Sequence, residues 1–364
     1  MNIRKATELY EAWLGKQLTI LPADLQRKHV AMAEDHFSFL RATFYRWMQC
    51  WPEICDVEDD APRVLAIGDI HVENFGTWQD AEGRLIWGVN DFDEAYELPY
   101  TLDLTRLATS AHIAIRASRL SIGAGDACEA ILAGYATGLE ERGRPFVLEE
   151  QNVWLRETVT GEMRDAAQFW AKFDALKEVR GKVPGGARKA IERLLPTPLP
   201  AYRMFHRIAG LGSLGRERFV AVAEFQGGKI AREAKALAPS ACGWAGKHGR
   251  STRILYERIL RQTVRAADPF VQMKGSWIVR RLSPHCRRIE LAALPAARDE
   301  KRLLRSMGFE VANIHLGTRV ARAKIARDLK KRGQGWLHAS AEKMLKQSAR
   351  DWEDWRRSGK PEIS

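Results

Sequence analysis

Two short apolar stretches, each followed by a cluster of acidic and amide side chains, constrain the fold of this chain most strongly. Val64–Ile67 runs into Gly68-Asp69-Ile70-His71-Val72-Glu73-Asn74, and Leu85–Val89 runs into Asn90-Asp91-Phe92-Asp93. Such short apolar runs, bounded by Gly, Asp and Asn, are typical of buried strands that end in turns. Asp80-Ala81-Glu82-Gly83 indicates a hairpin turn between the two strands, so we expect the two clusters to lie close together.

These clusters contain the groups that a metal-assisted transferase needs. Phosphoryl transfer requires a carboxylate beside the attacking hydroxyl, and oxygen ligands that hold magnesium against the nucleotide phosphates. Asp69, Asn74 and Asp91 can supply them. A single Asp after a strand often only caps a turn. Turn chemistry alone does not call for so many polar residues in two adjacent loops, so we interpret the clusters as a site.

The clusters resemble the catalytic and metal-binding loops of aminoglycoside phosphotransferases and choline kinases, members of the protein-kinase-like superfamily. The shared pattern is Gly-Asp-x-His-x-x-Asn followed by Asp-Phe-Asp. The longer strings GDIHVENFG, NDFDEA and LDLTRLATS are similar to a bacterial family of uncharacterised proteins, domain-of-unknown-function family 2252, which is grouped with those kinases. We expect this similarity to cover most of the chain.

The resemblance implies a role for each matching residue of the two clusters. Asp69 would be the catalytic base, Asn74 a magnesium ligand and Asp91 the principal metal-binding aspartate. Asp93 would add a second metal contact. The implied cofactors are ATP, or GTP, and Mg²⁺.

The resemblance also implies two supporting residues. His71 would be a structural member of the catalytic loop. Asp103 would be the buried aspartate that anchors this loop from the following helix.

A candidate nucleotide-binding loop lies after the acidic clusters rather than before them. A kinase needs a glycine-rich loop over the phosphates, and a strand lysine paired with a helix glutamate. Gly210-Leu211-Gly212-Ser213-Leu214-Gly215 is a G-x-G-x-x-G sequence that enters a strand, which favours the kinase loop over a dinucleotide-binding loop. The predicted cofactor-binding residues are Gly210, Gly212, Ser213, Gly215, Lys235 and Glu257.

Lys235 is the predicted phosphate-binding lysine. It lies on the second strand, Lys229–Leu237, of a glycine-turn hairpin whose first strand is Phe219–Phe225. Arg232 and Lys229 remain alternatives, because a slip of one residue in strand register reverses the two faces.

The elements after this hairpin complete the pattern of a kinase small lobe. Glu257, in a helix expected over Ser251–Ala267, would pair with Lys235, and further strands are expected at Trp277–Leu282 and Arg288–Leu291. The kinases named above place this lobe first. We therefore expect an α+β, two-lobed, protein-kinase-like fold that is circularly permuted, with a small antiparallel-sheet lobe and a mainly helical large lobe.

Proline positions suggest where the lobes divide. Pro196, Pro198 and Pro200 exclude both helix and sheet, and a new domain is expected near Tyr202. The predicted divisions are 1–200, the part of the large lobe with the catalytic and metal-binding loops, 203–292, the small nucleotide-binding lobe, and 293–364, the remaining large-lobe helices. The alternative, a degenerate small lobe at residues 1–60, is disfavoured because helical spacing dominates there.

Charge and cysteine content narrow the expected partners. Lys and Arg total 58 against 46 Asp and Glu, and a net charge of +12 favours acidic partners such as nucleotides, phosphorylated metabolites, nucleic acid or membrane surfaces. Nucleic acid is not favoured, because no zinc-finger or RNA-recognition motif accompanies this charge. The five cysteines form no C-x-x-C pair and the histidines lack metal-ligand spacing, so no zinc site is expected. Reduced thiols and the lack of a membrane-length apolar run indicate a cytoplasmic protein.

These features predict an ATP-dependent, magnesium-assisted phosphotransferase that acts on a hydroxyl of a small-molecule acceptor. Nucleotidyl transfer is a related possibility, which would use the same metal ligands with the nucleotide reversed. The other alternative is a non-catalytic regulator that binds nucleotide or an acidic partner on a kinase-like scaffold, since a fold does not fix a function.

Overall fold

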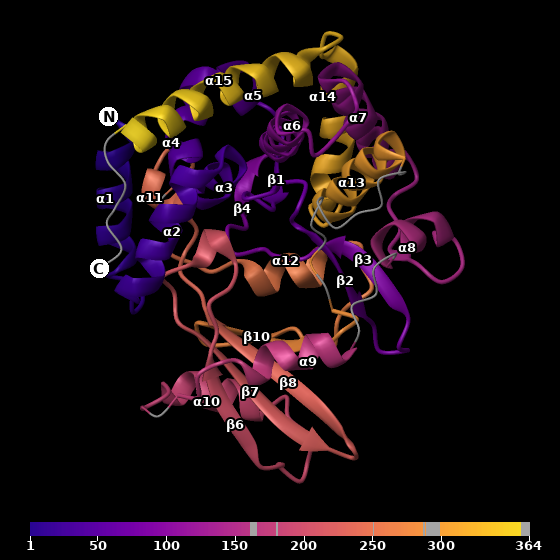
Figure 1. The fold of residues 1–364 in the computed structure, drawn as a ribbon. Helices are drawn as coiled ribbons and strands as arrows, with labels where there is room; N and C mark the ends of the chain where they lie inside the picture. Colours follow the sequence, from indigo (N-terminus) through magenta and orange to yellow (C-terminus); the bar gives the residue numbers. More distant parts are fainter. Residues whose placement is uncertain (161–165, 180, 250, 287, 289–298, 358–364) are drawn as a thin grey trace.

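The computed structural model describes residues 1–364 except 161–165, 180, 250, 287, 289–298 and 358–364. Helices and small antiparallel sheets give a mixed α+β fold, as expected (Figure 1). The described α-helices are α1 (Ile3–Leu14), α2 (Pro22–Glu34), α3 (His36–Ala42), α4 (Phe44–Ile54), α5 (Asp56–Asp59), α6 (Tyr100–Arg116), α7 (Ala124–Glu140), α8 (Val153–Thr160), α9 (Ala166–Asp174), α10 (Gly185–Glu192), α11 (Ala241–Ala245), α12 (Tyr256–Gln262), α13 (Glu300–His315), α14 (Arg322–Lys331) and α15 (Trp336–Arg357).

The described strands belong to three sheets. They are β1 (Arg63–Ala66), β2 (Phe75–Gln79), β3 (Leu85–Val89), β4 (Tyr96–Pro99), β5 (Phe146–Val147), β6 (Tyr202–His206), β7 (Arg218–Phe225), β8 (Gly228–Ala236), β9 (Gln272–Lys274) and β10 (Trp277–Leu282). Two short 3₁₀ helices are η1 (Leu211–Ser213) and η3 (Arg319–Ala321). Below, the helical part means α1–α7 and α13–α15, and the sheet part means β6–β10 with α9 and α10, at the bottom of Figure 1.

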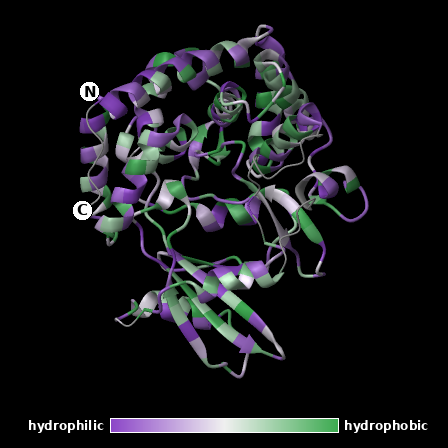
Figure 2. Cartoon of the chain, viewed as in Figure 1, coloured by the Kyte–Doolittle hydropathy of each residue, from purple (hydrophilic) through white to green (hydrophobic). Residues whose placement is uncertain are grey.

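The helical part follows from the apolar periodicity of the sequence. Phe37, Leu40, Phe44 and Trp47 on α3 and α4 are all buried, in a hydrophobic core that also receives residues from α6, α7, α13 and α15. The helical spacing noted for residues 1–60 therefore corresponds to helices α1 to α5. Figure 2 shows that α15, at the outer edge of this part, carries many hydrophilic residues, as expected of a helix that buries only one face.

Helices α7 and α13 are in close backbone contact because glycines lie where they meet. A Cβ atom on Gly134 would lie 1.8 Å from the carbonyl oxygen of Arg305, and one on Gly308 would lie 2.0 Å from that of Ile131. Only hydrogen fits at these positions. The close approach fixes α13, whose buried His315 reaches the loop that follows β1 through Asp103.

The hairpin expected between β1 and β3 is not formed. The Asp80–Gly83 turn is present, with Gly83 at φ +78°, but it joins β3 to β2 and not to the strand before Asp69. Strand β1 pairs instead with β4. The expectation was wrong because the chain already reverses at His71–Asn74, where the Asn74 N–H donates to the His71 carbonyl at 2.7 Å. The polar clusters still meet, because Asn90 N–H donates to the carbonyl of Asn74.

The sheet part contains the predicted glycine-turn hairpin. Its strand order is β6-β7-β8-β10-β9, and Gly227 at the β7–β8 turn has φ +82°. Ala187, Ala190 and Ile191 of α10 pack in the core on one face, and Phe173 of α9 packs in the core on the other. Strand β6 begins at Tyr202, directly after the three prolines.

Three further expectations have different outcomes. The helix expected over Ser251–Ala267 is shorter, because α12 covers Tyr256–Gln262 and Thr263 is already extended. Of the strand expected at Arg288–Leu291, Arg288 forms an isolated bridge with Gly76, and the other positions lie outside the described residues. All five cysteines are free thiols.

In the described part of the chain, every helix is too short or too polar to span a membrane.

Candidate active site

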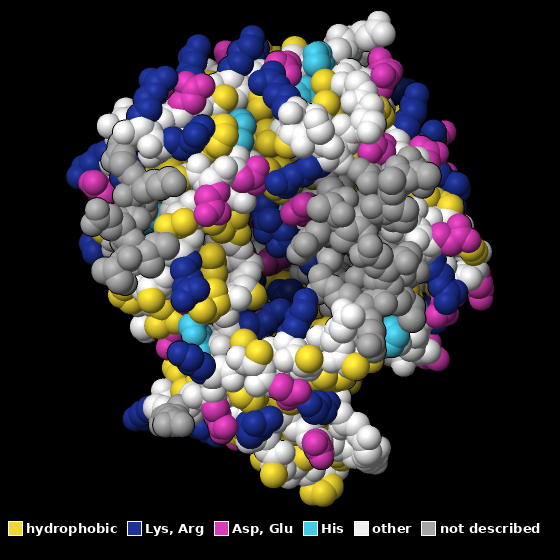
Figure 3. Space-filling view, viewed as in Figure 1, with side chains coloured by type: hydrophobic (Ala, Val, Ile, Leu, Met, Phe, Trp, Pro, Cys, Tyr) yellow, Lys and Arg dark blue, Asp and Glu magenta, His cyan; other side chains and the backbone are white. Residues whose placement is uncertain are grey.

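A cavity of about 900 Å³ lies where the helical part meets the sheet part, and many charged side chains line it. Figure 3 shows Lys and Arg side chains gathered inside this hollow. The predicted residues Asp69, Asn74, Asp91 and Asp93 line it from the helical part. The basic residues that line it include Arg207, Arg216, Arg218, Arg265, Arg280 and Arg281.

Asp103 holds the backbone of the loop that carries Asp69. It lies in the first turn of α6, is fully buried, and accepts hydrogen bonds from the N–H groups of Ile67 at 2.7 Å and Gly68 at 2.9 Å. The Nε2 atom of His315 lies 3.0 Å from Asp103 Oδ2, the oxygen that also accepts from Ile67. Gly68 is required here, because its φ is +80° and a Cβ atom would lie 2.5 Å from a backbone oxygen. The loop before Asp69 is therefore held by two hydrogen bonds to Asp103 and by a backbone turn that requires glycine.

Arg106, which the sequence reasoning missed, fixes the side chain of Asp69. Its Nε donates to Asp69 Oδ1 at 3.0 Å, and its terminal nitrogen also donates to the Leu40 carbonyl at 2.9 Å. The guanidinium is wholly buried against Phe44 and Trp47, each ring centroid being 4.9 Å away. The sequence did contain one indication of this role: Arg106 lies three residues after Asp103 on the same helix, and residues at this spacing share a helix face.

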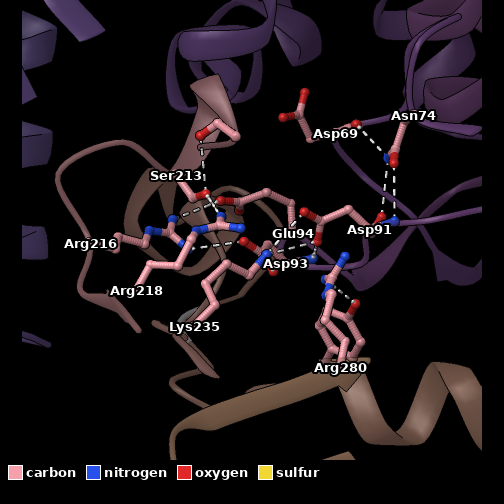
Figure 4. Close-up of polar contacts among 12 residues, drawn as sticks. Asp69, Asn74, Asp91, Asp93, Glu94, Ser213, Arg216, Arg218, Lys235 and Arg280 are labelled. Carbon is pink, nitrogen blue, oxygen red and sulfur yellow. Dashed lines mark hydrogen bonds and ion pairs between the residues drawn. The ribbon is translucent and has the colours of Figure 1, made fainter. Parts of the chain in front are cut away.

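Asn74 joins the two polar loops (Figure 4). Its Nδ2 donates to the carbonyls of Asp69 at 3.2 Å and Asp91 at 3.1 Å, while its Oδ1 accepts from the N–H of Asp91 at 3.0 Å. The amide oxygen predicted to bind magnesium is thus already engaged by the backbone. A metal would have to use its second lone pair, or Asn74 serves only to position Asp69 and Asp91.

His71 is packed within the loop that carries Asp69 and Asn74. The ring is buried, stacks edge-on against Phe37, and its Nδ1 accepts a hydrogen bond from the N–H of Glu73 at 3.2 Å. Burial, reinforced by Arg41, lowers the pKa of His71 well below its usual value. It is therefore a neutral acceptor within the turn.

Asp91 and Asp93 converge on one cationic atom. Lys235 Nζ lies 3.0 Å and 3.2 Å from the two carboxylate oxygens of Asp91, and 2.6 Å from Asp93 Oδ1 (Figure 4). Burial opposes ionisation of Asp91, but Lys235 and Arg280 outweigh it and hold its pKa well below the usual range. Burial and the neighbouring Asp91 raise the pKa of Asp93. Magnesium is commonly held by one or two carboxylates together with phosphate oxygens and water, so this pair fits the ion.

The strand register decides between the three candidate lysine and arginine residues. Lys235 is almost fully buried and faces the acids, whereas Arg232 points to the opposite face of the sheet and donates to the Leu194 carbonyl. Lys229 lies at the far end of the hairpin and pairs with the exposed Asp174. Only Lys235 lies against the acidic loops.

The expected pair between Lys235 and Glu257 is not formed. Glu257 is exposed on α12 and accepts a hydrogen bond from Arg261, one turn further along the same helix. Its side chain lines the cavity, but Lys235 is held by the two aspartates. The prediction assumed the pairing seen in kinases, and in this chain the acidic loop supplies the partners instead.

The glycine-rich loop lies over Asp69. A Cβ atom on Gly212 would lie 3.5 Å from Asp69 Oδ2, and Gly210 and Gly215 both have positive φ. The N–H groups of Ser213 and Leu214 donate to carbonyls within the loop, so they do not point at a ligand. The Ser213 hydroxyl accepts from Arg218 at 2.8 Å. In this structure the loop therefore offers arginine side chains to the cavity more directly than backbone N–H groups.

Two buried glutamates that the sequence reasoning did not assign hold these arginines. Glu233 is paired with Arg207 and with Arg218, and lies 4.0 Å from Arg280. Burial would raise its pKa, but the arginines outweigh this and hold the pKa well below the usual range. Its position two residues before Lys235, on the same face of β8, was the signal available in the sequence.

The second glutamate, Glu94, lies beside Asp93. Arg216 is 3.4 Å from Asp93 and 3.5 Å from Glu94, whose other oxygen accepts from the N–H of Ala241 at 2.7 Å and from Ser240. Burial raises the pKa of Glu94 to about 7, although Arg216 opposes the shift. Arg216 thus links the sheet part to the loop that carries Asp93 and Glu94.

Comparison with known proteins identifies one related family. No curated protein and no solved structure matches the chain. Residues 20–172 match a family described as "Uncharacterized protein conserved in bacteria (DUF2252)", which is less than the expected majority of the 364 residues. The chain is therefore similar to this bacterial family over the segment that contains Asp69, Asn74, Asp91 and Asp103.

Proposed function

We propose that this chain is a kinase-like, circularly permuted phosphotransferase that moves the γ-phosphoryl group of ATP or GTP to a hydroxyl of a small-molecule acceptor. The observation that carries the proposal is the convergence of Lys235 on Asp91 and Asp93, two acids that line an arginine-rich cavity together with Asp69. Two carboxylates, a buried lysine and a separate carboxylate are the groups that phosphoryl transfer uses.

Each residue has a definite task in this proposal. Asp91 and Asp93 would hold Mg²⁺, which, when bound, would neutralise charge on the phosphates. Lys235, which is paired with Asp91 and Asp93 in this structure, would bind phosphate oxygens of the nucleotide. Asp69 would orient the acceptor hydroxyl and take its proton, and Arg106 would keep that carboxylate at a fixed position.

The surplus of arginines in the cavity supports a second reaction at the same site. Arg216, Arg218 and Arg280 could bind the triphosphate of a nucleotide in either of two opposite orientations. Nucleotidyl transfer is therefore the second candidate reaction. A regulator that only binds nucleotide or another acidic partner is the alternative from a different class. Both alternatives use the same basic cavity, so nucleotide binding and group transfer must be measured in separate experiments.

Binding is tested first by thermal unfolding with ATP or GTP, with and without Mg²⁺. A ligand at about 100 times its dissociation constant adds about 2.7 kcal/mol to the free energy of unfolding. We expect magnesium-dependent stabilisation of the native chain that is lost in Asp91→Asn and reduced in Lys235→Met. Asp174→Asn, at an exposed ion pair on the sheet part, is the matched control and should respond like the native chain. Absence of any shift in the native chain would refute nucleotide binding.

Transfer is then tested with nucleotide labelled at either the α- or the γ-phosphate, and a panel of hydroxyl compounds. Label from the γ position on an acceptor supports phosphoryl transfer, and label from the α position supports nucleotidyl transfer. Nucleotide binding without transfer to any acceptor, together with unchanged binding in Asp69→Asn, favours the regulator.

A further inference from the structure

Away from the cavity, three helices of the helical part bring together a set of nitrogen and sulfur ligands. His112 on α6, Cys128 on α7 and His338 on α15 each offer one ligand atom, and these atoms all lie within 4.8 Å of one another. The Nε2 atom of His112 lies 3.3 Å from Cys128 Sγ. His112 and Cys128 are buried, and His338 is partly exposed. Figure 1 shows the three helices adjacent at the end of the molecule opposite the sheet part.

We propose that these three side chains form a binding site for a divalent zinc ion. Zinc prefers histidine nitrogen and cysteine thiolate, and binds them tetrahedrally at about 2.0–2.3 Å. Those bond lengths place the ligand atoms about 3.3–3.8 Å apart. The observed cluster is thus already close to this size, and shifts of about 1 Å in side-chain position would complete it.

A carboxylate behind His112 supports this assignment. Glu342 Oε1 lies 3.0 Å from His112 Nδ1, on the side of the ring opposite the Nε2 atom that faces Cys128. Histidines that bind metals commonly direct their other ring nitrogen to a carboxylate, which fixes the tautomer. His112 Nε2 also lies 3.3 Å from the carbonyl oxygen of Ala124, so zinc binding requires the tautomer with the proton on Nδ1, in which the Nε2 lone pair is free for the metal.

The state of His338 is a second, independent indication. Its Nδ1 atom is buried and has no hydrogen-bond partner among the described residues. A buried polar atom without a partner costs free energy that a metal bond would offset. Three protein ligands leave a fourth position for water, and the partial exposure of His338 gives that position a route to solvent.

The zinc ion would stabilise the fold and would take no part in the proposed phosphoryl transfer. It would tie α7 and α15 to α6, the helix that carries Asp103 and Arg106. Without a metal, the same atoms are explained by a weak hydrogen bond from the Cys128 thiol to His112 Nε2. The inference is therefore independent of the proposed function, and metal content rather than activity separates the two explanations.

The experiment uses the full chain without an affinity tag. It is stripped with a chelator, reloaded with Zn²⁺ or Co²⁺, and freed of excess metal. We expect one zinc per chain by mass spectrometry, a thiolate-to-cobalt charge-transfer band in the Co²⁺ form, and a lower Tm after chelation. Less than about a tenth of an equivalent of zinc, or cobalt bound without the charge-transfer band, would overturn the proposal.

Variants then assign the ligands. Cys128→Ser and His338→Gln should each lose most of the bound metal. Cys55→Ser, at another wholly buried cysteine, and His29→Gln, at another partly buried histidine, should retain it. Retention of one equivalent in both ligand variants would overturn the site. His338 lies partly at the surface, so His338→Gln decides the outcome even where Cys128→Ser does not fold.

Discussion

The contribution of Asp103 to stability can be worked out from its contacts. In Asp103→Asn the shape of the side chain is kept, but only one oxygen remains, and the new NH₂ group faces one of the two N–H donors at Ile67 and Gly68. Losing one charge-assisted hydrogen bond costs about 1.5–3 kcal/mol, and leaving a buried donor unpaired costs about 1–3 kcal/mol. Together they predict a loss of roughly 2.5–6 kcal/mol in the free energy of unfolding.

Urea denaturation measures this loss, and amide hydrogen exchange at Gly68 reports whether the loop has been released. Exchange there should be faster in Asp103→Asn, because the N–H then lacks its acceptor. Asp126→Asn, at an exposed position in the first turn of α7, is the control and should change stability by less than about 1 kcal/mol. A loss in Asp103→Asn that is no larger than in the control, with unchanged exchange at Gly68, would show that Asp103 does not anchor the loop.

Three further predictions concern buried charge and backbone contact. Burial raises the pKa of Glu310 to about 7, so the native state binds the extra proton and its stability falls as pH rises from about 4.5 to 7. Glu310→Gln should flatten this fall, measured by chemical denaturation, and should itself cost stability, because the new NH₂ group faces a donor at Val89 or Asn313. Glu233→Gln leaves buried arginines without their carboxylate and should cost about 3–5 kcal/mol by the same measurement, and a cost below 1 kcal/mol would contradict the buried network. Gly134→Ala should lower Tm, because its Cβ would meet the Arg305 carbonyl, whereas Gly125→Ala in the same helix has open space and should leave Tm unchanged or raise it; equal shifts would refute the contact.

The sequence alone was sufficient for features that depend on local chemistry. Helical periodicity placed α3 and α4, because apolar residues at this spacing must share a buried face. Turn residues placed the Gly227 hairpin, and three prolines placed the start of β6. The motif pattern singled out Asp69, Asn74 and Asp91 because their chemistry is concentrated in two short loops.

Partners that are distant in sequence needed the tertiary structure. Strand β1 pairs with β4 rather than with β3. The pattern of apolar residues alone did not show which of these strands would be its partner. The lysine of β8 has its partners about 140 residues earlier in the chain, at Asp91 and Asp93. Glu257 was misassigned for the same reason, because sequence order does not tell which acid is nearest in space.

The sequence by itself determined that this chain carries an acidic loop pair, a glycine-turn hairpin and a helical core, because each depends on residues close together along the chain. Only the tertiary structure decided that Arg106 holds Asp69, that Lys235 holds Asp91, and that α6 and α7 bring His112 to Cys128. These contacts join different elements, and their geometry is set by packing, which no spacing along the chain encodes.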